Sequence, residues 1–254
     1  MQTTTKLLPF AIGCLSVLSA AHADTTPVHD FSGNVAITSD YIFRGITQTN
    51  EGLAIQGGFE YTHTPSGFYA GAWASNVEFN AANNTNDSSI EMDLYAGIRG
   101  DFLDNATWDM GGIYYYYPDQ NEDAAAGDYN YLEIYGALGY QFPDVALKPT
   151  LGAKLSYSND YFGEDDGSLH SEGSIDLALP QDFGLGFNLG FLDVSGDKTT
   201  PRGYDYFHGG ATLSKDVAGF GLALSYHRVF DNKDCPATDK GFCKAVVFSV
   251  SRDF

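Results

Sequence analysis

Ionisable side chains alternate with apolar ones in several stretches of this sequence. SDYIFRGITQTN carries Asp40 and Arg44 among Tyr, Ile and Phe, and IEMDLYAGIRG carries Glu91, Asp93 and Arg99 in the same manner. Carboxylates and guanidinium groups on a shared face can either pair with one another or line a path for ions. Which of the two they do depends on the direction in which each side chain points.

A Ser-His-acid hydrolase built into a barrel wall is the enzymatic interpretation of the histidines. The candidates are His29, His63, His170, His208 and His227. No Gly-x-Ser-x-Gly elbow is present, and a strand would point the adjacent residues His170 and Ser171 to opposite faces. We therefore expect no catalytic residue, and the hydrolase stays the weakest alternative.

Acidic loops offer the carboxylates that Ca²⁺ prefers. They lie at 119–123, at 164–166 and at Asp231, Asp234 and Asp239. None has the glycine and the spacing of an EF-hand loop. We expect solvated loops, with no metal site and no cofactor.

Two cysteines, Cys235 and Cys243, follow the N-terminal segment that contains Cys14. An even pair in an exported chain predicts one disulfide, here within the last long connection. A loop this short would gain about 2–3 kcal/mol from the reduced entropy of the unfolded chain. Two cysteines without a nearby histidine or further cysteine do not favour a metal site.

The N-terminal segment MQTTTKLLPFAIGCLSVLSAAHAD has the pattern of a secretory signal. Lys6 precedes an apolar stretch, and Ala-His-Ala then supplies the small residues that a signal peptidase requires. Residues 1–23 are expected to be removed, leaving 24–254 as a single domain. The alternative is a lipoprotein anchored at Cys14, but further apolar residues follow Cys14 where a polar tether is expected.

Charge and composition exclude several classes of protein. Processing removes Lys6 alone among the charged residues, which leaves 12 basic and 33 acidic side chains and a net charge of −21. This charge disfavours nucleic acid and anionic surfaces as partners. No later apolar run approaches about 18 residues, so a helical membrane protein is excluded. Aromatic residues make up 15 % of the chain, which does not fit acidic disorder.

The dominant pattern is the alternation of apolar and polar residues along whole segments. In 53–63, Ile55 and Phe59 share one face while Gln56 and Glu60 occupy the other. Such alternation indicates half-buried strands. Twelve strands are predicted, at 33–43, 53–64, 67–78, 89–102, 105–117, 129–142, 147–157, 168–179, 184–194, 204–214, 219–230 and 244–254.

The connections between these segments alternate between long and short. Long polar stretches such as RGITQTNEG and PDQNEDAAAGD alternate with short ones such as TPSG and LDN. Outer-membrane barrels have short periplasmic turns, long outer loops and an even number of strands. We therefore predict a transmembrane antiparallel up-and-down β-barrel of twelve strands, surrounded by lipid in the bacterial outer membrane.

The two faces of the predicted strands differ in charge. One face is almost free of charge, apart from Arg228 and Arg252, whereas the other is too polar for the packed core of a soluble barrel. We expect the first face, with Tyr41 and Phe43, to contact lipid and the second to surround a hydrated lumen. The predicted pore lining consists of Asp40, Arg44, Glu60, Glu91, Asp93, Arg99, Glu133, Lys154, Glu172 and Asp176. These residues either set ion selectivity or form an ion-pair network that fills the barrel.

Aromatic residues of the apolar face concentrate at strand ends, as the interfacial girdles of a membrane barrel require. One rim is predicted to carry Tyr61, Tyr69, Tyr140, Phe142 and Phe254, and the other Tyr41, Phe43, Tyr114, Tyr116, Tyr157 and Tyr226.

The chain ends on its last strand with Phe254, and Val246, Phe248 and Val250 lie on the same face. This ending resembles the carboxy-terminal signal that the barrel-assembly machinery reads in bacterial outer-membrane proteins. Arg252 departs from the apolar residue that is usual at its position.

Three segments carry a family resemblance: SDYIFRGITQTN, AIQGGFEYTHTPSGFYAGAWASNV and IEMDLYAGIRG. They resemble the bacterial family of unknown function Gcw_chp, also called the TorF family of porins, over essentially the whole processed chain. The resemblance implies an outer-membrane barrel with a channel function, and it supplies neither a substrate nor catalytic residues. We predict a channel for small hydrophilic solutes or ions with a preference for cations. The alternative is a structural or surface-interaction barrel with a plugged lumen.

Overall fold

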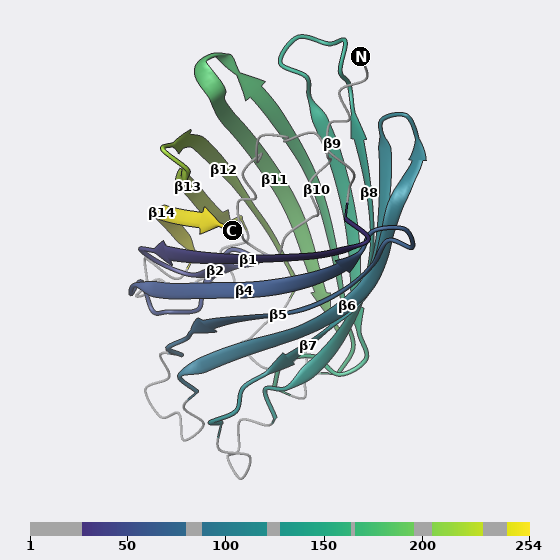
Figure 1. The fold of residues 1–254 in the computed structure, drawn as a ribbon. Coiled ribbons are helices and arrows are strands. Elements are labelled where there is room, and N and C mark those ends of the chain that lie inside the picture. Colours follow the sequence, from purple (N-terminus) through teal and green to yellow (C-terminus); the bar gives the residue numbers. More distant parts are fainter. Residues whose placement is uncertain (1–26, 80–87, 121–127, 164–165, 196–204, 231–242) are drawn as a thin grey trace.

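The computed structural model describes residues 27–79, 88–120, 128–163, 166–195, 205–230 and 243–254. These residues form one closed antiparallel barrel, in which every wall strand pairs with its neighbours in the sequence (Figure 1). The first wall strand pairs with both the second and the last, which closes the ring. The described residues contain no helix long and apolar enough to cross a membrane.

Twelve strands form the wall, as the sequence predicted. They are β1 (His29–Thr38), β4 (Ala54–His63), β5 (Phe68–Asn76), β6 (Ile90–Leu103), β7 (Ala106–Tyr116), β8 (Tyr131–Gln141), β9 (Thr150–Ser158), β10 (Ser168–Leu179), β11 (Phe183–Val194), β12 (Tyr206–Val217), β13 (Phe220–Val229) and β14 (Lys244–Asp253). Two short strands, β2 (Ile42–Phe43) and β3 (Ile46–Thr47), pair only with each other.

Side chains along each wall strand alternate between the outside and the inside of the barrel. In β4, Ile55 and Phe59 are 64 % and 66 % exposed, while Gln56 between them is buried. An apolar exterior of this kind suits a bilayer, which offers no water to a polar side chain or to an unpaired backbone group. The same alternation places the ionisable residues inside.

Short turns and long connections lie at opposite ends of the barrel. The turn between β12 and β13 consists of Ala218 and Gly219, both with positive φ (55° and 81°), as a two-residue hairpin requires. A 3₁₀ turn, Pro180–Asp182, joins β10 to β11 at the same end. We call this the turn end and the opposite end, with the long connections, the loop end.

The first long connection does not follow its prediction, because β1 ends at Thr38 instead of residue 43. Local hydrogen bonds draw the chain off the wall, a competition that Thr and Asp side chains favour. The Asp40 carboxylate accepts from the hydroxyls of Thr47 (2.6 Å) and Thr49 (2.9 Å). The chain then turns at Arg44 and Gly45, whose φ values are 48° and 84°. We call residues 39–53 the plug segment and its strands β2 and β3 the plug hairpin.

Three aromatic residues that were predicted to face lipid lie inside the barrel. Tyr41 is buried, and Phe43 packs against the same buried cluster, because both belong to the plug segment. Tyr69 is buried as well, since it has the same parity on β5 as the inward residue Trp73. A β-carbon at Gly97 on β6 would lie 2.3 Å from the Tyr69 hydroxyl, so this glycine makes room for the ring.

Most of the other predicted girdle residues are exposed on the outer face. They are Tyr114, Tyr116, Tyr140, Tyr157, Tyr226 and Phe254. Tyr61 and Phe142 are half-buried.

Candidate functional site

The predicted pore-lining residues separate into two groups along the lumen. Five are buried at the loop end beneath the plug segment or within it: Asp40, Arg44, Glu91, Asp93 and Glu133. Five lie nearer the turn end and keep more contact with solvent: Glu60, Arg99, Lys154, Glu172 and Asp176. Their role in lining a pore stays a prediction.

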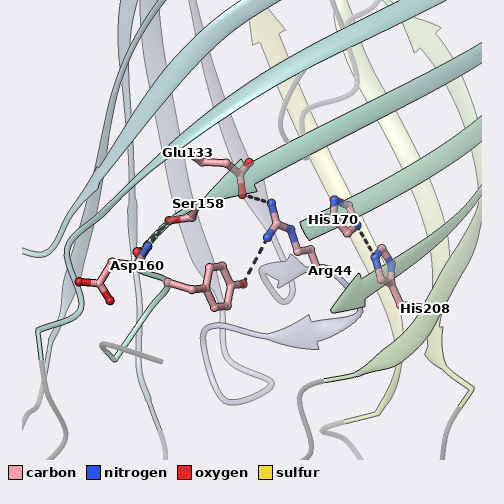
Figure 2. A network of polar contacts seen from close by, with 7 residues as sticks. Arg44, Glu133, Ser158, Asp160, His170 and His208 are labelled. Carbon is pink, nitrogen blue, oxygen red and sulfur yellow. Dashed lines mark hydrogen bonds and ion pairs between the residues drawn. The ribbon is translucent and has the colours of Figure 1, made fainter. Parts of the chain in front are cut away.

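Arg44, at the tip of the plug hairpin, reaches across the lumen to the opposite wall. Its Nη2 forms an ion pair with Oε2 of Glu133 on β8, and its Nη1 donates to the Tyr161 hydroxyl over 3.3 Å. The guanidinium also lies 4.7 Å from the centre of the Phe43 ring. Figure 2 shows the Arg44 and Glu133 side chains joined by this ion pair. The two side chains are only 6 % and 1 % exposed. The pair therefore fixes the plug hairpin to the wall in a nearly dry environment.

A second contact joins the plug segment to β6. Glu91 accepts hydrogen bonds from the hydroxyls of Tyr41 (2.7 Å) and Tyr117 (2.6 Å). The Tyr41 ring meets Trp73 edge-on, with centroids 5.5 Å apart. The backbone N–H of Glu78 also donates to the carbonyl of Gln48 over 2.7 Å. Together these bonds hold the segment along its length.

Aromatic rings fill the space around these polar contacts. Tyr115 stacks on Tyr131 with centroids 4.3 Å apart, and Tyr129 stacks on Phe162 at the same separation. The four consecutive tyrosines at 114–117 alternate as strand geometry requires. Tyr115 and Tyr117 are buried, while Tyr114 and Tyr116 are exposed. We call this packed group of rings at the loop end of the described barrel the aromatic seal.

Among the described residues beneath the aromatic seal, buried carboxylates outnumber the basic side chains that pair with them. Glu91, Asp93 and Glu133 are all buried, and Arg44 forms an ion pair with Glu133 alone among them. Among the described residues, neither carboxylate oxygen of Asp93 has a hydrogen-bond partner, and the same holds for Oε1 of Glu133. Burying a carboxylate without partners is costly, so this region favours a positive charge.

Asp40 lies outside the wall strands, within the plug segment. Burial raises the pKa of its carboxyl group, and the hydrogen bonds from Thr47 and Thr49 oppose that rise without cancelling it. The group therefore takes up a proton more readily inside the plug than it would in water.

The turn end holds a second Arg–Glu pair. Arg99 on β6 forms an ion pair with Glu60 on β4 and donates to the Thr62 hydroxyl over 3.0 Å. Its guanidinium lies 4.5 Å from the centre of the Tyr69 ring. The Tyr69 hydroxyl donates to Asp109 over 2.6 Å. This end of the lumen is polar, and its ion pair is open to water.

Sequence reasoning missed several lumen residues. Asp109 has the inward parity of β7, which could have revealed it. Tyr161 follows β9 in a connection, where alternation gives no direction, so nothing in the sequence pointed to its contact with Arg44.

Three predictions fall wholly or partly outside the described residues. The signal segment 1–23 lies outside them, as does Cys235. Cys243 is disulfide-bonded, but its pairing with Cys235 stays a prediction. Among the acidic-loop residues, Asp231, Asp234, Asp239 and the greater part of 119–123 and 164–166 are also outside.

The chain end helps to close the ring. Phe254 exchanges two backbone hydrogen bonds with Gly33, of 2.9 and 3.0 Å. A role for Phe254 in barrel assembly remains a prediction.

The chain belongs to the family described as "Bacterial protein of unknown function (Gcw_chp)", whose model matches residues 21–254. No curated protein matches the sequence.

Several solved structures share the fold. The COG4313 outer membrane channel from Pseudomonas putida F1 is 13 % identical, with a TM-score of 0.54, and the match covers 93 % of this chain and all of that one. The NanC porin is 9 % identical, with a TM-score of 0.53, over 87 % of this chain and 98 % of that one. The KdgM porin, described in complex with disordered oligogalacturonate, matches at 9 % identity and a TM-score of 0.53, over 88 % and 97 %.

Proposed function

We propose that this protein is an outer-membrane channel for small hydrophilic solutes or ions, and that its plug segment closes the lumen at the loop end. The observation that carries the proposal is the distribution of charge. The exterior of the barrel is apolar, while its interior carries ionisable side chains from the plug segment and from strands that include β4, β6, β8, β9 and β10. The shared fold with outer-membrane channels and porins supports the same conclusion.

We further propose that the open lumen prefers cations. Seven of the ten predicted lining residues are acids and three are bases. Rings of carboxylates lower the energy of a cation in a narrow passage and raise that of an anion.

The test is single-channel recording of the refolded protein across a planar bilayer with a salt gradient. We expect low conductance from the wild type and larger, cation-selective conductance from a variant whose plug is released, such as Arg44→Ala. Anion selectivity of the released variant would contradict the preference. The proposed channel function would be overturned if neither protein conducts although circular dichroism verifies that both barrels are folded.

A structural or surface-interaction barrel is the second candidate, and the aromatic seal favours it. If the barrel does not conduct ions after the plug is released, this candidate gains support. A lipid hydrolase receives no such support from the described residues. Nε2 of His227 lies 3.0 Å from the Ser225 hydroxyl, but both side chains lie on the inner face of β13, away from lipid.

A further inference from the structure

Two histidines on non-adjacent strands meet on the inner wall. His170 lies on β10 and His208 on β12, and their Nε2 atoms are 2.8 Å apart. The rings are nearly parallel, with an interplanar angle of 15° and centroids 5.1 Å apart. Figure 2 shows the two imidazoles facing each other beside Arg44. Both side chains are buried.

A carboxylate completes a three-residue group. Glu172 lies two residues after His170, and therefore on the same face of β10. One ligand atom from each of His170, Glu172 and His208 lies within 4.8 Å of the others. Asn188 on β11 donates to Oε2 of Glu172 over 3.0 Å, which orients the carboxylate.

A glycine on the intervening strand makes this arrangement possible. Gly190 of β11 pairs with Glu172 on one side and with His208 on the other. A β-carbon at this position would lie 2.3 Å from Nε2 of His208 and 2.9 Å from Nε2 of His170. Any larger residue would therefore push the two imidazoles apart, and the bare backbone leaves the space in which they converge.

The donor set has a defined metal preference. Two imidazole nitrogens and one carboxylate oxygen suit Zn²⁺ and its neighbours Ni²⁺ and Cu²⁺, whereas Ca²⁺ and Mg²⁺ prefer oxygen donors alone. Nitrogens bound to a tetrahedral Zn²⁺ at about 2.0–2.1 Å lie roughly 3.3 Å apart. The observed pair, 2.8 Å apart, therefore has to open by about half an ångström to hold the ion.

We infer that His170, His208 and Glu172 form a binding site for a Zn²⁺-like divalent cation on the lumen wall. Three protein ligands leave a coordination position for water or a passing solute. Asn188 acts as a positioning residue, because its hydrogen bond holds the Glu172 carboxylate. The site goes beyond the proposed channel function, since binding does not require that the lumen conduct.

The surrounding charges set a limit on affinity. Arg44 acts electrostatically on both histidines, and Lys154 of β9 pairs in register with Glu172. Both cations oppose a bound dication, and Glu133 compensates for Arg44. Replacing Lys154 with Gln should therefore tighten binding.

The experiment is isothermal titration of ZnCl₂ into the full barrel, refolded in detergent and purified without a polyhistidine tag. His29 and His63, whose rings lie 5.4 Å apart at the turn end, are replaced by Ala in every protein so that they add no second site. We expect one saturable Zn²⁺ per barrel. Loss of an outer-shell partner alone costs about 10- to 100-fold in metal affinity, so loss of a direct ligand should cost at least as much. We expect at least about 100-fold for His170→Ala and His208→Ala, and about 10-fold or more for Glu172→Gln.

Two matched variants sharpen the result. His227→Ala removes another lumen histidine and should bind Zn²⁺ within about two-fold of the parent. Gly190→Ala keeps all three ligands but places a β-carbon in the space where the two Nε2 atoms converge, so it should lose binding. If an alanine variant does not refold, His208→Gln is measured in its place, because glutamine keeps much of the size and hydrogen-bonding capacity of histidine.

Spectroscopy supplies a readout that does not depend on affinity. Co²⁺ bound by the site should give visible d–d absorption that disappears in His208→Gln and persists in His227→Ala. The inference is overturned if the folded parent binds no Zn²⁺, or if the His170 and His208 variants bind it as tightly as the parent. In either case the two imidazoles share only a hydrogen bond.

Discussion

The two Arg–Glu pairs of the lumen have the same chemistry and different surroundings. The Arg44–Glu133 side chains are 6 % and 1 % exposed, while those of Arg99 and Glu60 are 24 % and 17 % exposed. The first pair joins the plug hairpin to β8, and the second joins two wall strands, β6 and β4, on either side of β5. We therefore expect the buried pair to hold the plug hairpin firmly against the wall, and we call this pair and the Tyr41–Glu91 contact the lock. Water screens the second pair, which we expect to hold its strands only weakly.

Arg44→Ala should have the largest effect, because it leaves Glu133 buried without its counter-ion next to the unpartnered Asp93. Losing one member of a buried pair costs about 3–5 kcal/mol, which is roughly 100-fold or more in the closed-to-open equilibrium. Single-channel recording should show a large rise in open probability. Trp73, whose ring contacts Tyr41, supplies a fluorescence signal for plug release once Trp108 is replaced by Phe.

A double variant separates the lost ion pair from the lost contacts. Arg44→Met combined with Glu133→Met removes both charges and keeps apolar volume, so it should close the lumen better than either single variant. If the double variant opens as widely as Arg44→Ala, the lock depends on the shape of the arginine and not on its charge.

The wall of the barrel could be predicted from the sequence because its strands present apolar side chains to the outside and polar ones to the inside. Phe59 and Gln56 differ in exposure for that reason alone, and the alternation extends over all twelve strands. The plug could not be predicted in the same way. Alternation continues through Phe43 and gives the parity of a residue, but it does not say where the chain leaves the wall. The hydroxyls of Thr47 and Thr49, which hold Asp40, are the physical cause and have no periodic signature.

The group of His170, Glu172 and His208 could not be predicted from the sequence, and the reason differs from that for the plug. The sequence gives His170 and Glu172 a shared face but not the register that places His208 beside them across β11. Register in a barrel depends on the shear of the whole ring, which no local stretch of sequence contains.

Tyr41→Phe should have an intermediate effect on the lock. It keeps the ring against Trp73 and removes one hydrogen bond to the Glu91 carboxylate, worth about 1.5–3 kcal/mol. Open probability should rise by roughly 10- to 100-fold. Tyr157→Phe, on the exposed outer face, is the matched control and should change nothing. Equal effects from the two variants would mean that the Glu91 contact does not restrain the plug.

Arg99→Ala should leave the plug closed and change the ion selectivity of the open channel. An ion pair this exposed contributes at most about 1 kcal/mol to stability because water screens it. In a channel opened by Arg44→Ala, removing Arg99 should shift the reversal potential toward stronger cation selectivity, since Glu60 loses its counter-ion. An Arg99→Ala barrel that opens as readily as Arg44→Ala would abolish the distinction between the two pairs.

The smallest effect is expected from pH, through Asp40 in the plug segment. Burial raises the pKa of its carboxyl group above the ordinary 3.8, so the closed plug binds a proton more tightly than the released segment does. By linkage, Asp40 weakens the plug as the pH rises through the window that begins near 3.8, and acid restores it. Asp40→Asn removes this titration. The ratio of wild-type to Asp40→Asn open probability should therefore increase with pH across that window and then level off. A ratio that falls as the pH rises would show that the hydrogen bonds from Thr47 and Thr49 stabilise the charged carboxylate more than burial penalises it.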